Sequence, residues 1–170
     1  KIFCCKMNCI KNISIMFSND CEAKNDTIIF NYKFNKKPNK RLISGFKKLI
    51  FSDHNSNKEI FEQLIIEDFE GFKKSHFNKD VSNLPSSLTY LRFGWSFDQD
   101  VSNLPPFLTH LKFGTLFNQD VLELPPSLTH LTFGDFFNRD VSVLPQTLTH
   151  LTFGNNFDQD VSNLPPSLIH

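Results

Sequence analysis

Histidine recurs at one position of the sequence every 20 residues. His110, His130, His150 and His170 follow one another at that interval, and Tyr90 occupies the same place one interval earlier. Imidazole can ligate a metal, exchange a proton near neutral pH or hydrogen-bond a partner. A catalytic residue needs unique surroundings, whereas these histidines occur in nearly identical short sequences. We therefore predict no catalytic site, and we favour repeated surface positions over a histidine metal site.

Aspartate recurs at the same interval in another part of the unit. Five stacked carboxylates could be bridged by calcium, but the sequence offers no glycine-rich loop to supply carbonyl ligands. Aspartate beside a turn more often accepts hydrogen bonds from nearby backbone amides. We therefore predict a structural role and no metal for Asp80, Asp100, Asp120, Asp140 and Asp160.

All four cysteines lie in the first 21 residues, at positions 4, 5, 9 and 21. A zinc site of four thiolates is one interpretation, but Cys4 and Cys5 are adjacent and no Cys-x-x-Cys pair occurs. A secreted protein would more often distribute its cysteines through the fold as disulfides. The pattern favours reduced thiols in an intracellular protein. We expect a cytoplasmic location and no cofactor.

These side chains are positioned by a 20-residue unit that repeats from residue 77 onward. The segment Phe77–Pro85 returns in similar form at Phe97, Phe117, Phe137 and Phe157. Each unit carries about six apolar side chains, too few to offset an ordering entropy of roughly 1.5 kcal/mol per residue. The unit gains a core only by stacking on its neighbours, so we predict a solenoid with one coil per repeat.

Within each unit a short alternating run predicts a strand, as at Thr129–Phe133. Successive strands would pair in parallel about 4.8 Å apart, which stacks one phenylalanine from each coil in a column. The members of this column are Phe93, Phe113, Phe133 and Phe153. The glycine that follows, such as Gly94, is expected to make a turn with positive φ. The Leu-Pro-Pro run at Leu104 predicts an extended or polyproline-like return.

The first 41 residues form a predicted basic leader. Nine Lys or Arg there face three acidic residues. We expect this leader to be poorly ordered, with a strand at Thr27–Phe34 where apolar residues alternate. The run Lys36–Arg41 contains a proline and four cations, which is typical of a linker.

Residues 42–76 are predicted to form an N-terminal cap or degenerate repeats. Phe46–Phe51 has the apolar spacing of Leu88–Phe93, so the repeat pattern extends back to this segment. A capping-box pattern that begins at Ser56 also favours a short helix at 57–72. In either form, this part would cover the open end of the stack.

The pattern Phe-Asn-Gln-Asp-Val-Ser-Asn-Leu-Pro-Pro-Ser-Leu-Thr-His-Leu-Thr-Phe-Gly resembles the FNIP repeat, a relative of leucine-rich repeats found in slime moulds and in giant viruses of amoebae. The family's repeats are usually slightly longer, with proline where this chain has Asp100. The resemblance implies a mainly β, leucine-rich-repeat-like solenoid with a parallel sheet of short strands. Its units would be 77–96, 97–116, 117–136, 137–156 and a partial 157–170.

The asparagine ladder of ordinary leucine-rich repeats has no counterpart at its usual position. That position holds Ser96, Leu116, Phe136 and Asn156, so we predict no regular ladder there. We expect a neighbouring set of side chains to accept hydrogen bonds from exposed turn amides instead. This set is Asn78, Asp98, Asn118, Asn138 and Asp158.

The resemblance implies a module for protein–protein interaction and no enzyme. In giant viruses such repeats often follow an F-box that docks onto a ubiquitin-ligase scaffold. Residues 42–73 lack the Leu-Pro opening of an F-box, so substrate recruitment to a ligase rests on analogy alone. The predicted partner-binding residues face outward from the strands: Tyr90, Arg92, His110, Lys112, His130, Thr132, His150 and Thr152.

The alternative function is nucleic-acid binding through the basic leader, where Phe30, Tyr32 and Phe34 would stack bases. We favour a monomeric binder of an unknown protein, with nucleic acid less favoured, and no apolar run approaches the length that crosses a bilayer. Because the sequence begins with Lys1 and stops inside a fifth unit, we expect a fragment of a longer protein. If the protein is viral, its expected location is the host cytoplasm.

Overall fold

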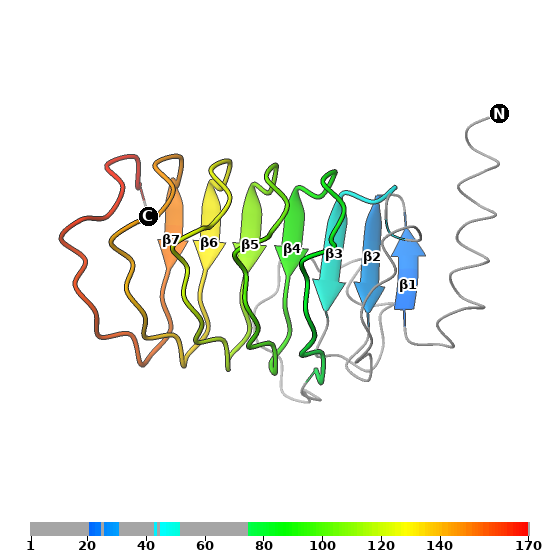
Figure 1. Cartoon of the computed structure of the whole chain (residues 1–170), viewed down its shortest axis with the longest axis horizontal. Coiled ribbons are helices and arrows are strands. Elements are labelled where there is room, and N and C mark those ends of the chain that lie inside the picture. The colour runs from blue at the N-terminus through cyan, green and yellow to red at the C-terminus, as the bar shows by residue number, and fades with distance from the viewer. Residues whose placement is uncertain (1–20, 25, 31–42, 44, 52–74, 170) are drawn as a thin grey trace.

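Strands of successive coils lie side by side in a single sheet, in the order in which they occur in the sequence (Figure 1). The computed structural model describes residues 21–24, 26–30, 43, 45–51 and 75–169. Within these ranges the sheet has seven strands. They are β1 (Cys21–Lys24), β2 (Thr27–Phe30), β3 (Lys48–Phe51), β4 (Tyr90–Arg92), β5 (His110–Lys112), β6 (His130–Thr132) and β7 (His150–Thr152).

The sheet is parallel from β2 to β7, and only β1 is antiparallel to its neighbour β2. From β4 onward the register is in step with the repeat, so that Leu91, Leu111 and Leu131 lie opposite one another. This arrangement confirms the predicted solenoid with one short strand per coil. The predicted helix at 57–72 lies outside the described residues.

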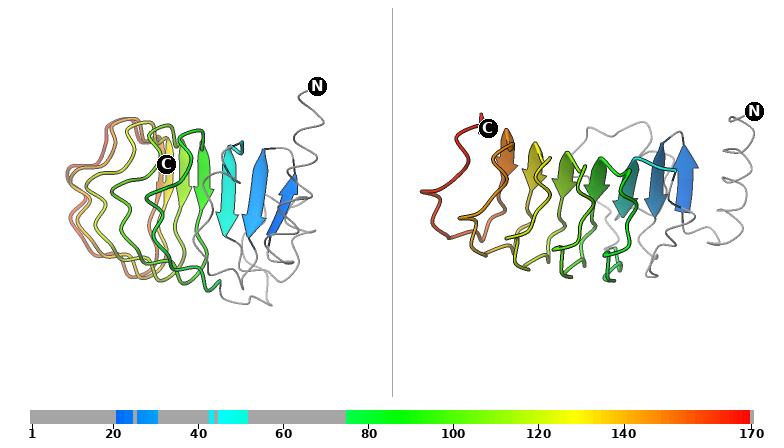
Figure 2. Two further views of the ribbon diagram at one scale, coloured as in Figure 1. Left: turned by 45° about the vertical axis from the view of Figure 1, so that its right-hand side comes forward. Right: turned by 45° about the horizontal axis from the view of Figure 1, so that its top comes forward.

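The return side of each coil is the part of the chain that leads from the end of one strand to the start of the next, and Figure 2 shows it in two oblique views. It contains tight turns. The amide of Leu84 donates to the carbonyl of Val81 at 3.3 Å, and the amide of Leu88 donates to the carbonyl of Pro85 at 3.2 Å. Proline fits this second turn because its carbonyl is used and its missing N–H is not needed. The prediction of an extended or polyproline-like return was therefore wrong where the turns lie, at residues 82–83 and 86–87, while Leu84 and Pro85 between them belong to neither a turn nor a helix.

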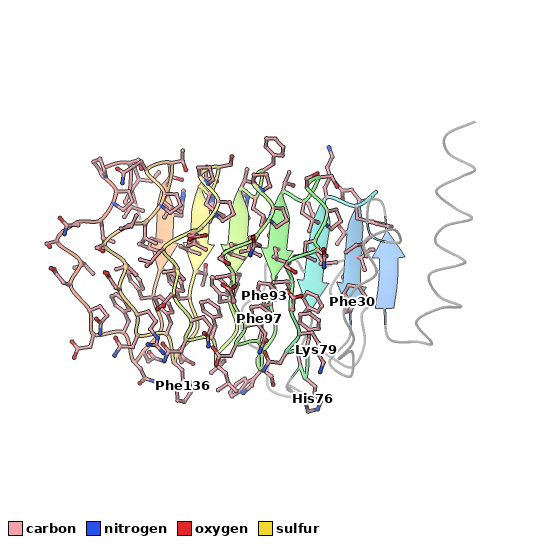
Figure 3. All side chains as sticks on the ribbon, viewed as in Figure 1. Phe30, His76, Lys79, Phe93, Phe97 and Phe136 are labelled. Carbon is pink, nitrogen blue, oxygen red and sulfur yellow. The ribbon has the colours of Figure 1, made fainter. Side chains whose placement is uncertain are left out.

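Two columns of phenylalanine fill the interior. In the first column, Phe93 and Phe113 have ring centroids 5.8 Å apart, which confirms the predicted stack that continues to Phe153. A second column runs through Phe97 and Phe117 at 6.1 Å. Rings of the two columns face each other, since the ring centroids of Phe93 and Phe97, which are close together in the chain, lie 3.6 Å apart (Figure 3). Each ring is thus packed by its own coil and by its neighbours.

The glycine after each strand allows close approach of two backbones. A Cβ added to Gly114 would lie 1.9 Å from the carbonyl oxygen of Gly94, and one added to Gly134 would lie 2.0 Å from that of Gly114. Neither residue has φ in the left-handed region. The predicted positive φ was therefore wrong for these glycines. Glycine is required because the coils stack here without room for a side chain.

A ladder of polar side chains ties the coils together on the return side. The Oδ1 atom of Asn78 accepts the amide of Asp98 at 3.0 Å, and that of Asp98 accepts the amide of Asn118 at 2.9 Å. The same bond repeats from Asn118 to Asn138 and from Asn138 to Asp158. The prediction that these residues accept backbone amides is confirmed, but the amides belong to the equivalent residues of the next coil and not to turns, so the bonds form a regular ladder between coils.

Two segments of the predicted leader belong to the sheet. The strand expected at Thr27–Phe34 is present over Thr27–Phe30, and β1 precedes it. These eight residues form strands within the segment that was expected to be a poorly ordered leader, while residues 1–20, 25 and 31–41 lie outside the described part. β3 confirms that the repeat spacing reaches back to Phe46–Phe51, because it pairs with β4 in the predicted register. Among the described residues, no helix has the length and apolar character needed to cross a bilayer.

Candidate functional site

The outward side of strands β4 to β7, which together with Lys48 of β3 is called the strand face below, brings together all eight predicted partner-binding residues. Strand pairing aligns Tyr90 with His110, His130 and His150 in one row. It aligns Arg92 with Lys112, Thr132 and Thr152 in a second row. Alternation along a strand turns Leu91 and its equivalents inward and these side chains outward. All eight are half-buried except Thr152, which is exposed.

The aromatic rings of the first row form a stack. His110 and His130 have ring centroids 4.2 Å apart at an interplanar angle of 12°, and His130 and His150 are also 4.2 Å apart. Tyr90 lies 5.9 Å from His110 at one end of the stack. Because the imidazoles stack face to face, a ligand meets their edges. The nitrogens of parallel rings also point in the same direction and do not converge on one point. This arrangement is unsuited to binding one shared metal ion.

A threonine before each strand fixes the adjacent imidazole. The hydroxyl of Thr109 donates to the carbonyl of Thr89 in the preceding coil at 2.9 Å, and its Oγ1 lies 2.9 Å from Nδ1 of His110. Thr129 and Thr149 repeat both contacts with His130 and His150. When the hydroxyl donates its single proton to the carbonyl, Nδ1 is the donor to Oγ1. The neutral imidazole then carries its proton on Nδ1 and a lone pair on Nε2.

Charge is segregated around the coil. Strands β3 to β7 contain Lys48, Arg92 and Lys112 but no aspartate or glutamate. Lys48 belongs to the row of Tyr90, because strand pairing places the two residues opposite each other. The carboxylates of the Asp80 and Asp100 positions lie on the return side of the coils and are exposed. The strand face is therefore cationic although the whole chain has no net charge.

The surroundings of the strand face shift the pKa of three side chains. Burial lowers the pKa of His110, and the positive neighbours His130, Lys48 and His150 lower it further. The pKa of His130 is lowered by burial and by the charge of His150. Burial raises the pKa of Tyr90, while Arg92 acts in the opposite direction. Both histidines thus favour the neutral form in the free protein.

Two shallow hollows adjoin each other on the strand face. The larger has a volume of about 340 Å³ and is lined by Lys48, Thr89, Tyr90, Thr109 and His110. The smaller, of about 170 Å³, shares Tyr90 and His110 and extends to His130 and Thr132. Together they run across the strands from β3 to β6. This surface suits an elongated ligand rather than a small molecule enclosed in a pocket.

The aspartates of the return side hold local turns. Oδ1 of Asp100 accepts the amide of Ser102 at 2.9 Å, and Oδ2 accepts its hydroxyl at 2.9 Å. These two hydrogen bonds lower the pKa of Asp100, and the equivalent bonds from Ser142 and Ser162 lower the pKa of Asp140 and Asp160. Asp80 makes the same pair of bonds to Ser82. In the described part of the chain, no three His, Cys, Asp or Glu residues are grouped so that they could hold a metal ion.

The alternative nucleic-acid site loses one of its three aromatic residues. Phe30 is fully buried and stacks on Phe51 at 5.2 Å, so its ring belongs to the core and is closed to a base. Tyr32 and Phe34 lie outside the described residues. The error arose because alternation in the sequence does not say which side of a strand faces solvent.

Sequence reasoning missed Lys48 and the threonines at 89, 109, 129 and 149. The alignment of Phe46–Phe51 with Leu88–Phe93 already placed Lys48 opposite Tyr90, so this member could have been found. The threonine before each histidine was visible as a repeated dipeptide. Its hydrogen bond to the preceding coil depends on how coils stack, which the sequence does not specify.

Comparisons with known proteins place this chain among repeat proteins. The family model described as FNIP Repeat matches residues 77–116, 100–136, 117–156 and 137–170. Among solved structures, the chain is similar to CroV588, a giant-virus protein described as a novel circular leucine-rich-repeat structure, with 35% identity and a TM-score of 0.50. The match covers 88% of this chain and 27% of CroV588, so this chain spans about a quarter of that protein. No curated protein matches the sequence.

Proposed function

The chain belongs to the FNIP repeat family, and on this premise we propose that it is a protein-interaction scaffold that binds its partner on the strand face. A leucine-rich-repeat-like solenoid presents an extended surface on which many side chains recur at fixed spacing. Repetition suits the binding of another protein, and it does not suit catalysis, which needs one set of unlike groups. We accordingly propose no enzymatic activity.

One observation supports the strand face over the rest of the surface. The two hollows described above both lie on it and share Tyr90 and His110. Tyrosine and arginine, which are enriched among the residues that dominate binding energy, are adjacent there as Tyr90 and Arg92. The return side instead presents carboxylates that are already engaged in turns, such as Asp100 with Ser102.

Affinity purification from the native cell tests this proposal. The bait is compared with a variant in which Tyr90, His110 and His130 are changed to alanine. The matched control changes three exposed residues of the return side, Lys79, Glu123 and Gln146, to alanine. We expect the strand-face variant to lose the proteins that the unchanged chain and the control both retain.

Retention of the same proteins by the strand-face variant would contradict the assignment of the face. Urea unfolding of each bait shows whether the variants remain folded. The variants are compared by quantitative mass spectrometry, so that partial losses are also measured.

The family resemblance extends the proposal to substrate recruitment for a ubiquitin ligase and to an intracellular location. Both extensions rest on analogy and on the cysteine pattern rather than on the geometry of the strand face. Co-purification of a ligase scaffold protein with the full-length protein would support the first. Fluorescence microscopy of the tagged full-length protein tests the second.

A further inference from the structure

The strand face has the chemistry of a surface that receives carboxylates. Lys48, Arg92 and Lys112 supply fixed positive charge on three neighbouring strands. Strands β3 to β7 contain no aspartate or glutamate, so these strands carry an excess of positive charge. Such an excess attracts a partner of opposite charge and increases its rate of association.

The threonine–histidine contacts add a second kind of group to the same surface. Since Nδ1 of His110 and His130 is held by Thr109 and Thr129, protons enter and leave these rings at Nε2. Nε2 lies at the end of the ring away from Cβ, and therefore away from the sheet. A neutral ring offers a lone pair there, and a protonated ring offers an N–H donor. While Nδ1 donates to threonine, only the protonated ring presents an N–H at Nε2 to a carboxylate.

The same geometry disfavours a nucleic acid as the ligand. Single-stranded binders stack bases on open aromatic faces. On this surface both faces of His130 are covered by neighbouring rings at 4.2 Å, and His110 stacks between His130 at 4.2 Å and Tyr90 at 5.9 Å, which leaves their edges for contact. Carboxylates need only edges and cations, so an acidic peptide fits better.

We propose that the strand face binds an acidic, extended segment of a protein partner, and that binding strengthens as His110 and His130 take up protons. This rests on the proposed function and specifies its partner. The carboxylates lie along the adjoining hollows, with Lys48 at one end and Thr132 at the other. Arg92 and Lys112 flank them from the second row.

The dependence on pH follows from the groups that surround the two imidazoles. His110 faces Tyr90 and Arg92 on β4, Lys112 on its own strand and His130 on β6, with Lys48 on β3 also acting on it. His130 lies between His110 and His150. These neighbours are cationic or neutral, so they oppose protonation in the free protein. A bound carboxylate removes that opposition, and binding is therefore coupled to proton uptake.

The test uses synthetic peptides and fluorescence anisotropy with the full chain. The probe is a fluorescein-labelled decapeptide of alternating glutamate and serine, and the matched controls replace every glutamate by glutamine or by lysine. We expect the glutamate peptide to bind at least tenfold more tightly than either control at pH 6.0. Its Kd should fall about three- to tenfold from pH 7.5 to pH 6.0, where its carboxylates stay ionised.

Three variants assign the effect to residues. The change of Arg92 and Lys112 to glutamate should weaken binding more than tenfold. The same change of Lys79 and Arg139, two cations of the return side, should alter Kd less than twofold although the net charge changes equally. The double variant His110→Gln and His130→Gln should bind at pH 7.5 but lose the pH dependence.

Equal binding of the glutamate and glutamine peptides would overturn the inference. So would equal weakening by the strand-face and return-side charge changes, or tighter binding of a labelled ten-nucleotide DNA strand than of the glutamate peptide. Circular dichroism at both pH values verifies that each variant is folded. Suppose that the glutamate peptide shows no preferential binding while the variant with alanine at Tyr90, His110 and His130 still loses its protein partners. In that case the strand face is the binding surface, but its ligand is not an acidic segment. If that variant keeps its partners, the proposed function itself fails.

Discussion

The N-terminal strands β2 and β3 and the repeat strands β4 to β7 share one inward row and differ in the outward row. Leu49 of β3 and Leu91 of β4 are opposite each other and fully buried. In the outward row, Ile50 of β3 is 2% exposed, whereas its partner Arg92 is half-buried on the strand face. Ile29 of β2 is opposite Ile50 and is also buried.

This difference indicates that the inward side chains stabilise the stacking of the coils. The outward side chains determine the chemistry of the surface. β3 continues the sheet and its phenylalanine column, since Phe51 stacks on Phe93 at 5.7 Å. β3 does so although it lies outside the regular 20-residue repeat, so stacking does not require one kind of residue at the outward positions. In the row of Arg92 these positions are apolar and buried in β2 and β3, and they are polar or cationic from β4 onward, where the repeats begin.

The largest expected effect comes from removing an inward ring. Phe117 is fully buried between Phe113 of its own coil and Phe97 and Phe137 of the neighbouring coils. Phe117→Ala should lower the free energy of unfolding by about 3–5 kcal/mol, measured by urea denaturation, because it leaves a cavity in both columns.

Phe107, which is 63% exposed, provides the control from the same part of the chain. Phe107→Ala should change the free energy of unfolding by no more than about 0.5 kcal/mol. Similar losses in both variants would contradict the division into inward and outward rows.

A methyl group at the stacked glycines should be nearly as damaging. In Gly134→Ala the new Cβ would lie 2.0 Å from a backbone oxygen of the preceding coil, so the coils must separate. We expect a loss of about 3 kcal/mol, at the upper end of the usual cost of overpacking. The exposed Gly45, near β3, has no atom within 4 Å of an added Cβ. Gly45→Ala should be neutral to within about 0.5 kcal/mol, and an equal loss would mean that coil stacking does not require glycine.

Exchanging outward residues between the N-terminal strands and the repeat strands tests the comparison directly. Ile50→Thr introduces a hydroxyl at a buried position and should cost about 1–3 kcal/mol in thermal or urea unfolding. The reciprocal change Thr132→Ile, on the strand face, should stay within about 0.5 kcal/mol. Equal costs would show that burial in the outward row does not differ between the N-terminal strands and the repeat strands.

The smallest effect concerns pH. Because the folded protein lowers the pKa of His110 and His130, these residues contribute stability that is complete above the unfolded pKa of about 6.5. That contribution is lost as pH falls through their folded pKa values. The urea midpoint should therefore decrease from pH 7.5 to pH 5.5, and His110→Gln with His130→Gln should reduce this decrease. His76→Gln, an exposed histidine outside the strand face, should leave it unchanged; an equal effect would refute the assignment.

The sequence predicted the repeat architecture because the constraint is local and recurs. A 20-residue period with leucine, valine and phenylalanine at fixed places can bury those side chains only by stacking. Strands, parallel pairing and the column of Phe93 follow from that one condition. The eight residues of the strand face follow as well, since alternation in a strand determines which side chains turn away from the core.

Two of the errors concern interactions between coils or beyond the repeats. The close contact at Gly114 depends on how far apart two backbones lie, which no single repeat encodes. The turns of the return side are local, between residues three apart, and the Leu-Pro run does not by itself show where they close. Phe30 was assigned to a nucleic-acid surface because an isolated alternating strand has two equivalent sides. Only its pairing with β3 makes Phe30 part of the core.

The sequence by itself determined that identical coils stack and which side chains each coil turns outward, because burial of apolar residues at a fixed period leaves no other arrangement. Tertiary structure decided how those outward side chains act together. The imidazole stack, the threonine that fixes its tautomer and the grouping of Lys48 with Arg92 join residues from different coils. Their interactions depend on distances of a few ångströms across the sheet, which arise only when the coils are packed.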